Sequence, residues 1–182
     1  MTIAIVGNGM SMLQRNYGKL IDACDEVVRF NDFKIKGFER HVGTKMTIWA
    51  RNTCKDEFVL DGTFSIKSWL IQHTRFINPA VYDPDILLKF PRRTEIPSEI
   101  HDEICGFTGC DNLNTSTGIQ AIAFYAKTGN EILICGFDSF TPPRRYFDPP
   151  ADRYMPHSTN ESLYIQHLIG QGLIKRFEDV ML

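Results

Sequence analysis

Hydrophobic and polar positions follow one another in blocks along the chain, and the first block is the clearest. A short apolar run from Thr2 to Val6, rich in β-branched residues, ends at Gly7-Asn8-Gly9. After Ser11, apolar residues recur at helical spacing. The pattern predicts a strand, a glycine turn and a helix with apolar positions at Leu13, Tyr17, Leu20 and Ile21.

Further apolar runs predict strands over residues 26–30, 45–50 and 131–137, and a less distinct one over residues 68–72. A helix is predicted to begin at Ser116-Thr117-Gly118, and its apolar positions recur from Ile119 to Ala126. The sequence Thr128-Gly129-Asn130 is typical of a helix end.

The pattern Ser158-x-x-Glu161 has the form of a capping box and predicts a last helix from there to about Gly170. Between residues 54 and 111 the pattern is hard to read, and a helix is predicted after Asp83. Residues 139–156 contain several prolines, which exclude regular structure and predict an irregular active-site loop.

Strands that alternate with helices predict an α/β fold, with a mostly parallel central sheet and helices on both faces, as in Rossmann-like proteins. A length of 182 residues with 43% hydrophobic residues fits a single domain over residues 1–182. In such sheets, ligands bind at the carboxyl ends of the strands. Asn8, Asn31, Asn52 and Asp138 fall at these ends, so we expect a polar site there.

Composition narrows the range of partners and of compartments. A formal net charge of -2 gives no basic field for a nucleic acid, so we expect no nucleic-acid partner. The N-terminal residues lack the features of a secretory signal, and no apolar run is long enough to span a bilayer. We expect a cytoplasmic protein, with peripheral contact at the inner face of a membrane left open. The five cysteines include no Cys-x-x-Cys pair, which favours reduced thiols.

Two common ligand motifs are incomplete or have a simpler explanation. A dinucleotide fingerprint needs a third glycine after Gly7 and Gly9, and Met12 stands in its place, which argues against an NAD-dependent oxidoreductase. A tight turn without a ligand remains an alternative. Asp83-Pro84-Asp85 has the Asp-x-Asp form of a metal site, but an Asp cap followed by Pro also begins a helix. We expect no metal.

Four groups of short segments occur in a fixed order. They are Val6-Gly7-Asn8-Gly9; Arg29-Phe30-Asn31 with Val42-Gly43; Ser116-Thr117-Gly118 with Gly136-Phe137-Asp138; and Tyr154-Met155-Pro156-His157-Ser158 with Glu161. The set resembles the sialyltransferase family. The first two groups are similar to its long sialylmotif, the third to its short motif and the fourth to its very short motif. The resemblance runs from residue 3 to about residue 165 and implies a GT-A variant fold in a short member of bacterial or viral type.

The resemblance also implies site roles. The donor would be a sugar linked to cytidine monophosphate (CMP), with Asn8 and Asn31 on its phosphate and ribose, and Asn52 on the sugar. Ser116 and Thr117 would bind the sugar carboxylate, as hydroxyls and amides at a helix N-terminus can, although a plain N-cap remains an alternative. The full predicted donor set is Gly7, Asn8, Gly9, Ser11, Asn31, Asn52, Ser116, Thr117, Gly118 and Asp138.

For catalysis, His157 matches the general base of the family. Tyr146, and after it Tyr154, would stabilise the leaving phosphate. Phe140 replaces a second tyrosine of the bacterial enzymes, and Arg144 and Arg145 could compensate. A catalytic role for Glu161 is less favoured, because the capping box explains this residue without one.

The function implied is inverting transfer of sialic acid from CMP-sialic acid to a hydroxyl of a glycan or glycolipid acceptor, without a metal cofactor. Alternatives are a CMP-Kdo-dependent transferase and a nucleotide-sugar-binding module that has lost transfer. A homo-oligomer is left open, because the chain is short for the family and a second subunit could complete the acceptor side.

Overall fold

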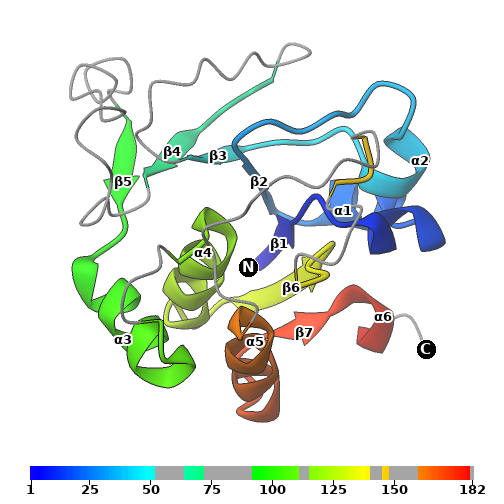
Figure 1. The fold of residues 1–182 in the computed structure, drawn as a ribbon. Coiled ribbons are helices and arrows are strands. Elements are labelled where there is room, and N and C mark those ends of the chain that lie inside the picture. The colour runs from blue at the N-terminus through cyan, green and yellow to red at the C-terminus, as the bar shows by residue number, and fades with distance from the viewer. Residues whose placement is uncertain (52–63, 72–91, 111–114, 140–144, 148–159, 181–182) are drawn as a thin grey trace.

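The computed structural model describes residues 1–51, 64–71, 92–110, 115–139, 145–147 and 160–180 (Figure 1). In this part of the chain, seven parallel strands form one sheet in the order β5-β4-β3-β2-β1-β6-β7. The strands are β1 Thr2–Val6, β2 Glu26–Phe30, β3 Ile48–Arg51, β4 Ser68–Ile71, β5 Arg93–Glu95, β6 Glu131–Cys135 and β7 Lys175–Arg176. The predicted α/β fold with a mostly parallel sheet is confirmed.

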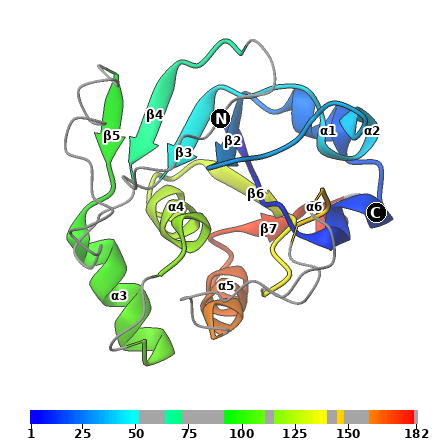
Figure 2. The ribbon, with the colours of Figure 1, turned by 45° about the horizontal axis from the view of Figure 1, so that its top comes forward.

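Helices cover both faces of this sheet. They are η1 Met10–Gln14 (a 3-10 helix), α1 Gly18–Ala23, α2 Glu39–Val42, α3 Ser98–Thr108, α4 Thr117–Ala126, α5 Glu161–Gly170 and α6 Phe177–Val180. Helices α3, α4 and α5 pack on one face, and the others lie on the opposite face (Figures 1 and 2). No helix within the described ranges is long and apolar enough to cross a membrane.

Alternate residues of the strands serve the two faces. Ile3 and Ile5 of β1 belong to the apolar cluster beneath α4, whereas Ala4 and Val6 belong to the cluster beneath η1 and α1. Because both faces are covered, the central strands are buried nearly throughout, as the continuous apolar runs predict.

The predicted helix after Ser11 is divided in two. Arg15 has an extended backbone between η1 and α1 (φ -137°, ψ 166°). The first residue of α1 is Gly18, and a Cβ there would collide with the backbone carbonyl of Glu39. The close approach of α2 thus fixes where α1 begins. The spacing of apolar residues within one segment does not reveal such a contact with another helix.

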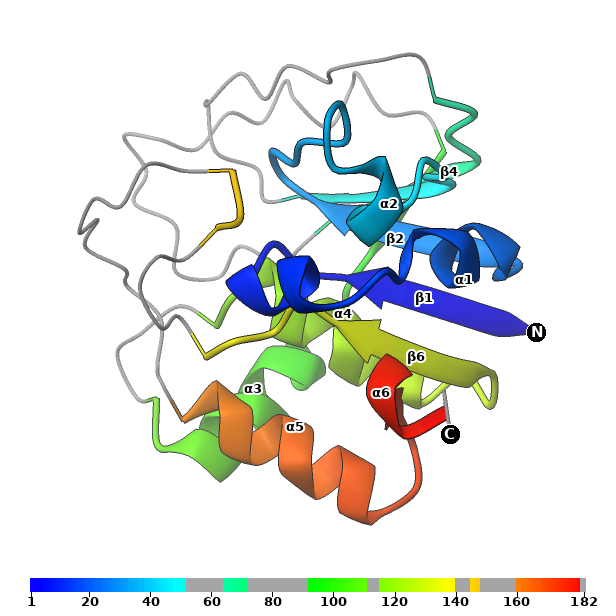
Figure 3. The ribbon, with the colours of Figure 1, turned by 90° about the vertical axis from the view of Figure 1, so that its right-hand side faces the viewer.

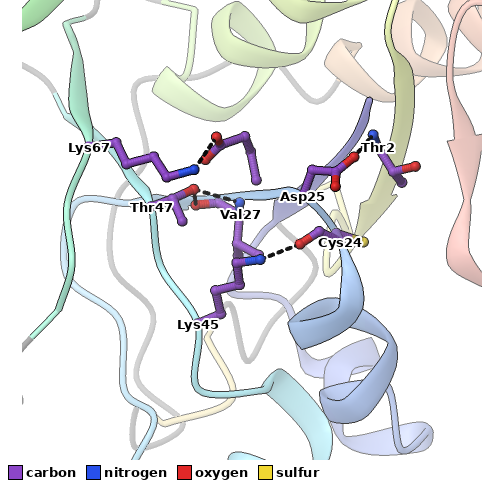
Figure 4. A network of polar contacts seen from close by, with 8 residues as sticks. Thr2, Cys24, Asp25, Val27, Lys45, Thr47 and Lys67 are labelled. Atoms are coloured by element: carbon purple, nitrogen blue, oxygen red, sulfur yellow. Dashed lines mark hydrogen bonds and ion pairs between the residues drawn. The ribbon is translucent and has the colours of Figure 1, made fainter.

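The amino ends of the first three strands are joined by polar contacts, shown in Figure 4. The Thr2 amide donates to Asp25 Oδ2 at 2.8 Å, and the Val27 amide donates to Thr47 Oγ1 at 2.9 Å. Lys45 donates through Nζ to the carbonyl of Cys24. These hydrogen bonds hold the strands in register at the edge opposite the predicted site. We therefore infer that they stabilise the fold.

One pair of cysteines corrects the expectation of reduced thiols. Cys105 and Cys110 form a disulfide at the end of α3, with Cα atoms 4.7 Å apart. Cys24 and Cys135 are free and buried. The turn after α3 brings the paired residues together through Gly109, whose φ of 69° is left-handed. An odd cysteine count could not reveal this local geometry.

The sheet has its switch point between β1 and β6. The chain leaves β1 toward β2, on one side, and later returns to the other side of β1 as β6. Figure 3 shows both strands pointing toward the same edge. In such sheets, a ligand-binding crevice forms where the connections diverge in this way.

The backbones that leave these two strands stay hydrogen-bonded to each other. The Gly7 amide donates to the Cys135 carbonyl at 2.8 Å, and the Gly9 amide donates to the Gly136 carbonyl at 2.9 Å. A Cβ at Gly7 would collide with the Gly136 carbonyl, and one at Gly136 would lie 2.6 Å from the Gly7 oxygen. Only glycine lets the two backbones come this close.

We therefore expect Gly7→Ala to destabilise the protein by about 2–3 kcal/mol, because the added methyl group meets backbone that cannot move aside. The control is Gly106→Ala on α3, where a Cβ would meet nothing within 4 Å. That change should be neutral or stabilise by up to about 1 kcal/mol, because alanine favours a helix. Chemical denaturation of both variants checks this, and equal stabilities would contradict it.

Candidate functional site at the switch point

The predicted glycine loop is held by Asp138, which follows β6. Its carboxylate accepts hydrogen bonds from the Ser11 amide at 2.8 Å and from the Ser11 hydroxyl. A Cβ at Gly9 would lie 2.5 Å from the same carboxylate. Ser11 and Asp138 were both predicted to bind the donor, and in this structure they bind each other. Asp138 also places negative charge at the start of η1, where a dinucleotide site would hold its pyrophosphate.

Asn8 joins the ends of three strands. It follows β1, and its Nδ2 donates to the carbonyl of Asp32, beyond β2, at 3.0 Å. Its own carbonyl accepts from the Tyr146 amide at 3.0 Å, in the segment after β6. Arg145 forms an ion pair with Asp32 and closes this set of contacts. Within the described part of the chain, the amide oxygen of Asn8 and its second N–H have no further partner and remain for a ligand, as the predicted donor role needs.

Asn31 has an unusual backbone at the end of β2. Its φ is 41°, one of two positive values among the non-glycine residues that the structure describes. The other belongs to Ser139, beyond β6, at the same edge of the sheet. The Asn31 carbonyl accepts from Trp49 Nε1 at 2.7 Å, and its amide donates to Ala50 at 2.9 Å. Left-handed non-glycine residues are costly and cluster at functional sites, which supports the predicted role of Asn31.

The two halves of the second motif group are physically joined. Arg29 is 1% exposed, and its guanidinium donates to the carbonyls of Val42 at 2.6 Å and Lys45 at 3.0 Å. Asp22 accepts from the amides of Thr44 and Lys45, both at 2.8 Å, beside the left-handed Gly43. These contacts fix the loops below Asn31. Arg29, Val42 and Gly43 are therefore structural supports of the site.

The start of α4 is tied to the start of α5. Ser116 is the N-cap of α4, and its hydroxyl accepts from the Ile119 amide at 3.2 Å. Glu161 accepts from the Ser116 amide at 2.7 Å and from the Ser116 hydroxyl at 2.6 Å. The capping-box explanation of Glu161 is wrong, because α5 begins at Glu161 itself and the carboxylate reaches across to α4.

Glu161 is a buried acid with a displaced titration. It is 5% exposed, and burial raises its pKa to about 7 against the opposing effect of the Ser116 hydrogen bonds. Near physiological pH, an acid with this pKa is present in both its charged and its neutral form. The protonation state of Glu161 thus sets the charge beside the predicted carboxylate site.

Thr117 and Gly118 begin α4 and connect it to the glycine loop. Thr117 is buried, and a Cβ at Gly118 would lie 2.8 Å from the ring of Phe137. Phe137 stands between Gly136 and Asp138, so contacts run without a break from Asn31 through Asn8 and Asp138 to Ser116. Gly118 is needed for this packing.

Tyr146 lies inside the protein. It is 6% exposed, its ring centroid is 5.0 Å from that of Phe38, and its hydroxyl donates to the Lys34 carbonyl. Burial raises its pKa to about 12. The single hydroxyl proton is thus used within the protein, and the predicted phosphate role requires Tyr146 to exchange this partner. Arg145 lies beside it in the sequence and is paired with Asp32.

The structure thus brings together Gly7, Asn8, Gly9, Ser11, Asn31, Ser116, Thr117, Gly118, Asp138 and Tyr146 at one edge of the sheet. The remaining predicted site residues, Asn52, Tyr154 and His157, lie outside the described residues, as do Phe140, Arg144, most of the loop 139–156 and Asp83-Pro84-Asp85. The contacts of Asp32, Arg145 and Glu161 were not predicted. They join residues far apart in sequence and leave no periodic signal.

A hollow open to solvent lies on the η1 side of Asp138. Arg15, Tyr17, Arg176 and Glu178 line it together with Ser11, Gly136 and Asp138. Tyr17 donates to Glu178 at 3.1 Å, and burial together with Glu178 raises its pKa to about 12. This contact joins α6 to the residue that precedes α1.

Comparison with known proteins confirms the resemblance to sialyltransferases. Residues 1–78 match the model of glycosyltransferase family 29 (sialyltransferase). The chain is 25% identical over 175 residues to sialyltransferase-like protein 2 of Arabidopsis thaliana, covering 94% of this chain and 38% of that protein. The chain therefore spans well under half the length of this relative.

Two solved structures share the fold. A mammalian sialyltransferase in complex with Gal-beta-1-3GalNAc-ortho-nitrophenol has a TM-score of 0.67 at 22% identity, over 97% of this chain and 68% of that chain. The sialyltransferase CstII of Campylobacter jejuni, in complex with the substrate analogue CMP-3FNeuAc, has a TM-score of 0.64 at 14% identity, over 96% and 81% of the two chains. The fold is that of these sialyltransferases.

The buried acid makes stability depend on pH. Because the pKa of Glu161 rises from 4.5 to about 7 on folding, the folded state holds this proton more tightly. That stabilisation is complete below pH 4.5 and is lost as pH rises through 7, about 3 kcal/mol in all. Glu161→Gln keeps the shape and cannot ionise. Urea denaturation between pH 4.5 and 8 should show wild type losing stability relative to this variant; parallel curves would refute the assignment.

Proposed function

We propose that this chain transfers sialic acid from CMP-sialic acid to a hydroxyl group of a glycan or glycolipid. The observation that carries the proposal is the run of contacts at the switch point, which unites segments similar to the long and short sialylmotifs around Asn8, Asn31 and Ser116. The family match over residues 1–78 and the fold shared with a sialyltransferase that holds a CMP-sugar analogue support it.

On this proposal, the donor lies along the edge formed by the loops after β1, β2 and β6. Asn8 offers an amide acceptor and a second N–H to the ribose and phosphate side, and Asn31 presents its side chain from a strained backbone. Ser11 and Asp138 position the loop, since their polar groups bond each other. Asn52 remains the proposed contact to the sugar.

The carboxylate of the acidic sugar would bind at the N-terminus of α4, where helix amides attract an anion. Glu161 lies beside Ser116 and competes with such an anion when it is charged. Binding therefore favours protonated Glu161, which its pKa of about 7 makes available at neutral pH. Transfer should weaken as pH rises above this value.

The chemical step is proposed as a single displacement with inversion. His157 accepts the proton of the acceptor hydroxyl while the oxygen attacks the anomeric carbon and CMP leaves with the electron pair of the broken bond. Tyr154, and Tyr146 once its hydroxyl turns from Lys34, donate hydrogen bonds to the phosphate. Side-chain donors take the place of a metal ion in this scheme.

The proposal also includes the cellular location and the oligomeric state of the protein. We place the protein in the cytoplasm, where a glycolipid acceptor would be reached at the inner face of a membrane. The Cys105–Cys110 disulfide removes cysteine usage as support for this location. We also propose a homo-oligomer, in which a second subunit contributes to the acceptor side of the site.

Release of CMP from purified protein tests the function. We expect release from CMP-sialic acid, CMP-Kdo or both in the presence of a sugar acceptor, and a fall of about a hundredfold or more in His157→Ala, the range for loss of a general base. Donor binding should persist in that variant. The control is His167→Ala on the exposed side of α5, which should keep full activity.

The donor that is consumed decides between the two acidic sugars. If neither is consumed but one of them raises the melting temperature, the chain is a nucleotide-sugar-binding module without transfer. Equal release from wild type and His157→Ala would overturn the assignment of the base.

A further inference from the structure

The disulfide at the end of α3 lies next to a buried row of polar side chains. His101 is 4% exposed, and its Nε2 lies 3.4 Å from Cys105 Sγ. On the other side of the ring, Nδ1 lies 2.9 Å from Thr115 Oγ1. Gln120 of α4 donates through Nε2 to the same hydroxyl at 2.7 Å. The row therefore links the disulfide to the residue before the N-cap of α4.

One assignment of protons satisfies each of these contacts. Thr115 Oγ1 accepts from Gln120 and donates its own proton to His101 Nδ1, so the imidazole carries its proton on Nε2, facing the disulfide sulfur. Gln120 Oε1 is buried and has no hydrogen-bond partner among the residues that the structure describes. A buried amide oxygen in this state is costly, and it becomes an acceptor for the Thr115 hydroxyl when the amide rotates.

A second path joins the same disulfide to the site. Asn160 donates through Nδ2 to the carbonyl of Thr108 at 3.2 Å, just before the turn that carries Cys110. The next residue, Glu161, holds the Ser116 amide and hydroxyl. Both paths end at Thr115 and Ser116, where α4 begins.

Resting on the proposed function, we infer that the Cys105–Cys110 disulfide is a redox-sensitive brace that holds the start of α4 ready for the donor. The pair is open to thiol–disulfide exchange with a dithiol, because Cys105 is only partly buried whereas Cys110 is enclosed. The dithiol attacks Cys105 Sγ, and the Cys110 sulfur leaves and takes a proton. The second thiol then displaces Cys105, so that two cysteine thiols and one oxidised reductant result.

Reduction of the disulfide changes both the buried row of polar side chains and the turn after α3. The new Cys105 thiol can donate to His101 Nε2, which moves the imidazole proton to Nδ1 and reverses the contact with Thr115. The Thr115 proton then turns toward Gln120, whose unpartnered oxygen accepts it once the amide rotates. At the same time the turn after α3 loses its covalent closure, and the support of Ser116 weakens.

Binding of CMP-3FNeuAc, the CMP-sugar analogue, to oxidised and reduced protein tests this inference, because the analogue carries the sugar carboxylate proposed to bind at α4. Isothermal titration calorimetry with and without dithiothreitol, with EDTA in every buffer, should show about five- to tenfold weaker binding after reduction, a usual size for coupling between two sites. By linkage, the saturating analogue must make the disulfide harder to reduce by the same factor in a glutathione redox buffer, about 30 mV for a tenfold effect. A merely structural disulfide would show no such shift.

Three variants sharpen the result. Cys105→Ser with Cys110→Ser should bind the analogue like the reduced wild type. Thr115→Val keeps the side-chain volume, removes the hydroxyl between His101 and Gln120, and should show a smaller difference between the two redox states than the wild type, because the path through Asn160 remains. Cys24→Ser alters a buried free cysteine elsewhere and should keep the wild-type response. Circular dichroism establishes that each variant is folded, and the reduced wild type replaces the double variant if that one does not fold.

Failure of this inference is distinct from failure of the proposed function. If the analogue binds both redox forms equally, the brace is refuted and the proposed function stands. If the analogue binds neither form, the proposed function fails. Amide hydrogen exchange of residues 117–126 still tests the brace in that case: faster exchange after reduction supports it, and unchanged exchange refutes it.

Discussion

Two backbone hydrogen bonds between the loops after β1 and β6 organise this molecule. The Gly7 amide bonds the Cys135 carbonyl and the Gly9 amide bonds the Gly136 carbonyl, at 2.8 and 2.9 Å. They carry the pairing of the two strands past their ends, to the point where the chain connections diverge. Asn8, Asp138 and Phe137 take their positions from this extension, and through them the loops after β2 and the start of α4 are joined.

Two carboxylates then hold η1 and α4 at this edge, and each binds the amide and the hydroxyl of one serine. Asp138 holds Ser11 at η1, and Glu161 holds Ser116 at α4. Burial raises the pKa of Glu161 to about 7. The end of the site at α4 thus changes its charge near neutral pH. The hydrogen bonds at the opposite edge of the sheet keep the strands in register and take no part in the site.

Much of the fold follows from local pattern. Strands β1 and β2 match the predicted ranges because central parallel strands are buried on both faces and read as unbroken apolar runs. Helix α4 was found from its N-cap and spacing. Helix α3 was not predicted, although Ile100 and Ile104 lie one helical turn apart. The residues around it form no clear apolar strand, so the pattern did not show where the helix begins and ends. The division of η1 from α1 depends on α2, which no local window contains.

The site was predictable in outline only. Order and spacing of short motifs identified the glycine loop, Asn31 and the start of α4, because these residues sit at strand and helix ends. Their partners were not predictable. The Ser116–Glu161 and Asp32–Arg145 contacts and the burial of Tyr146 arise from tertiary packing, and two of the predicted ligand contacts, Ser11 and Asp138, prove to be partners of each other.

The central claim is that the loops after β1 and β2 and the start of α4 form one nucleotide-sugar site. A titration of isotope-labelled protein with the CMP-sugar analogue CMP-3FNeuAc, followed by amide chemical shifts, tests it most directly. We predict that the largest changes occur together at Asn8, Asn31 and residues 116–119, with one common dissociation constant. Changes confined to the hollow around Arg15 and Arg176, or none at a saturating concentration of the analogue, would contradict it.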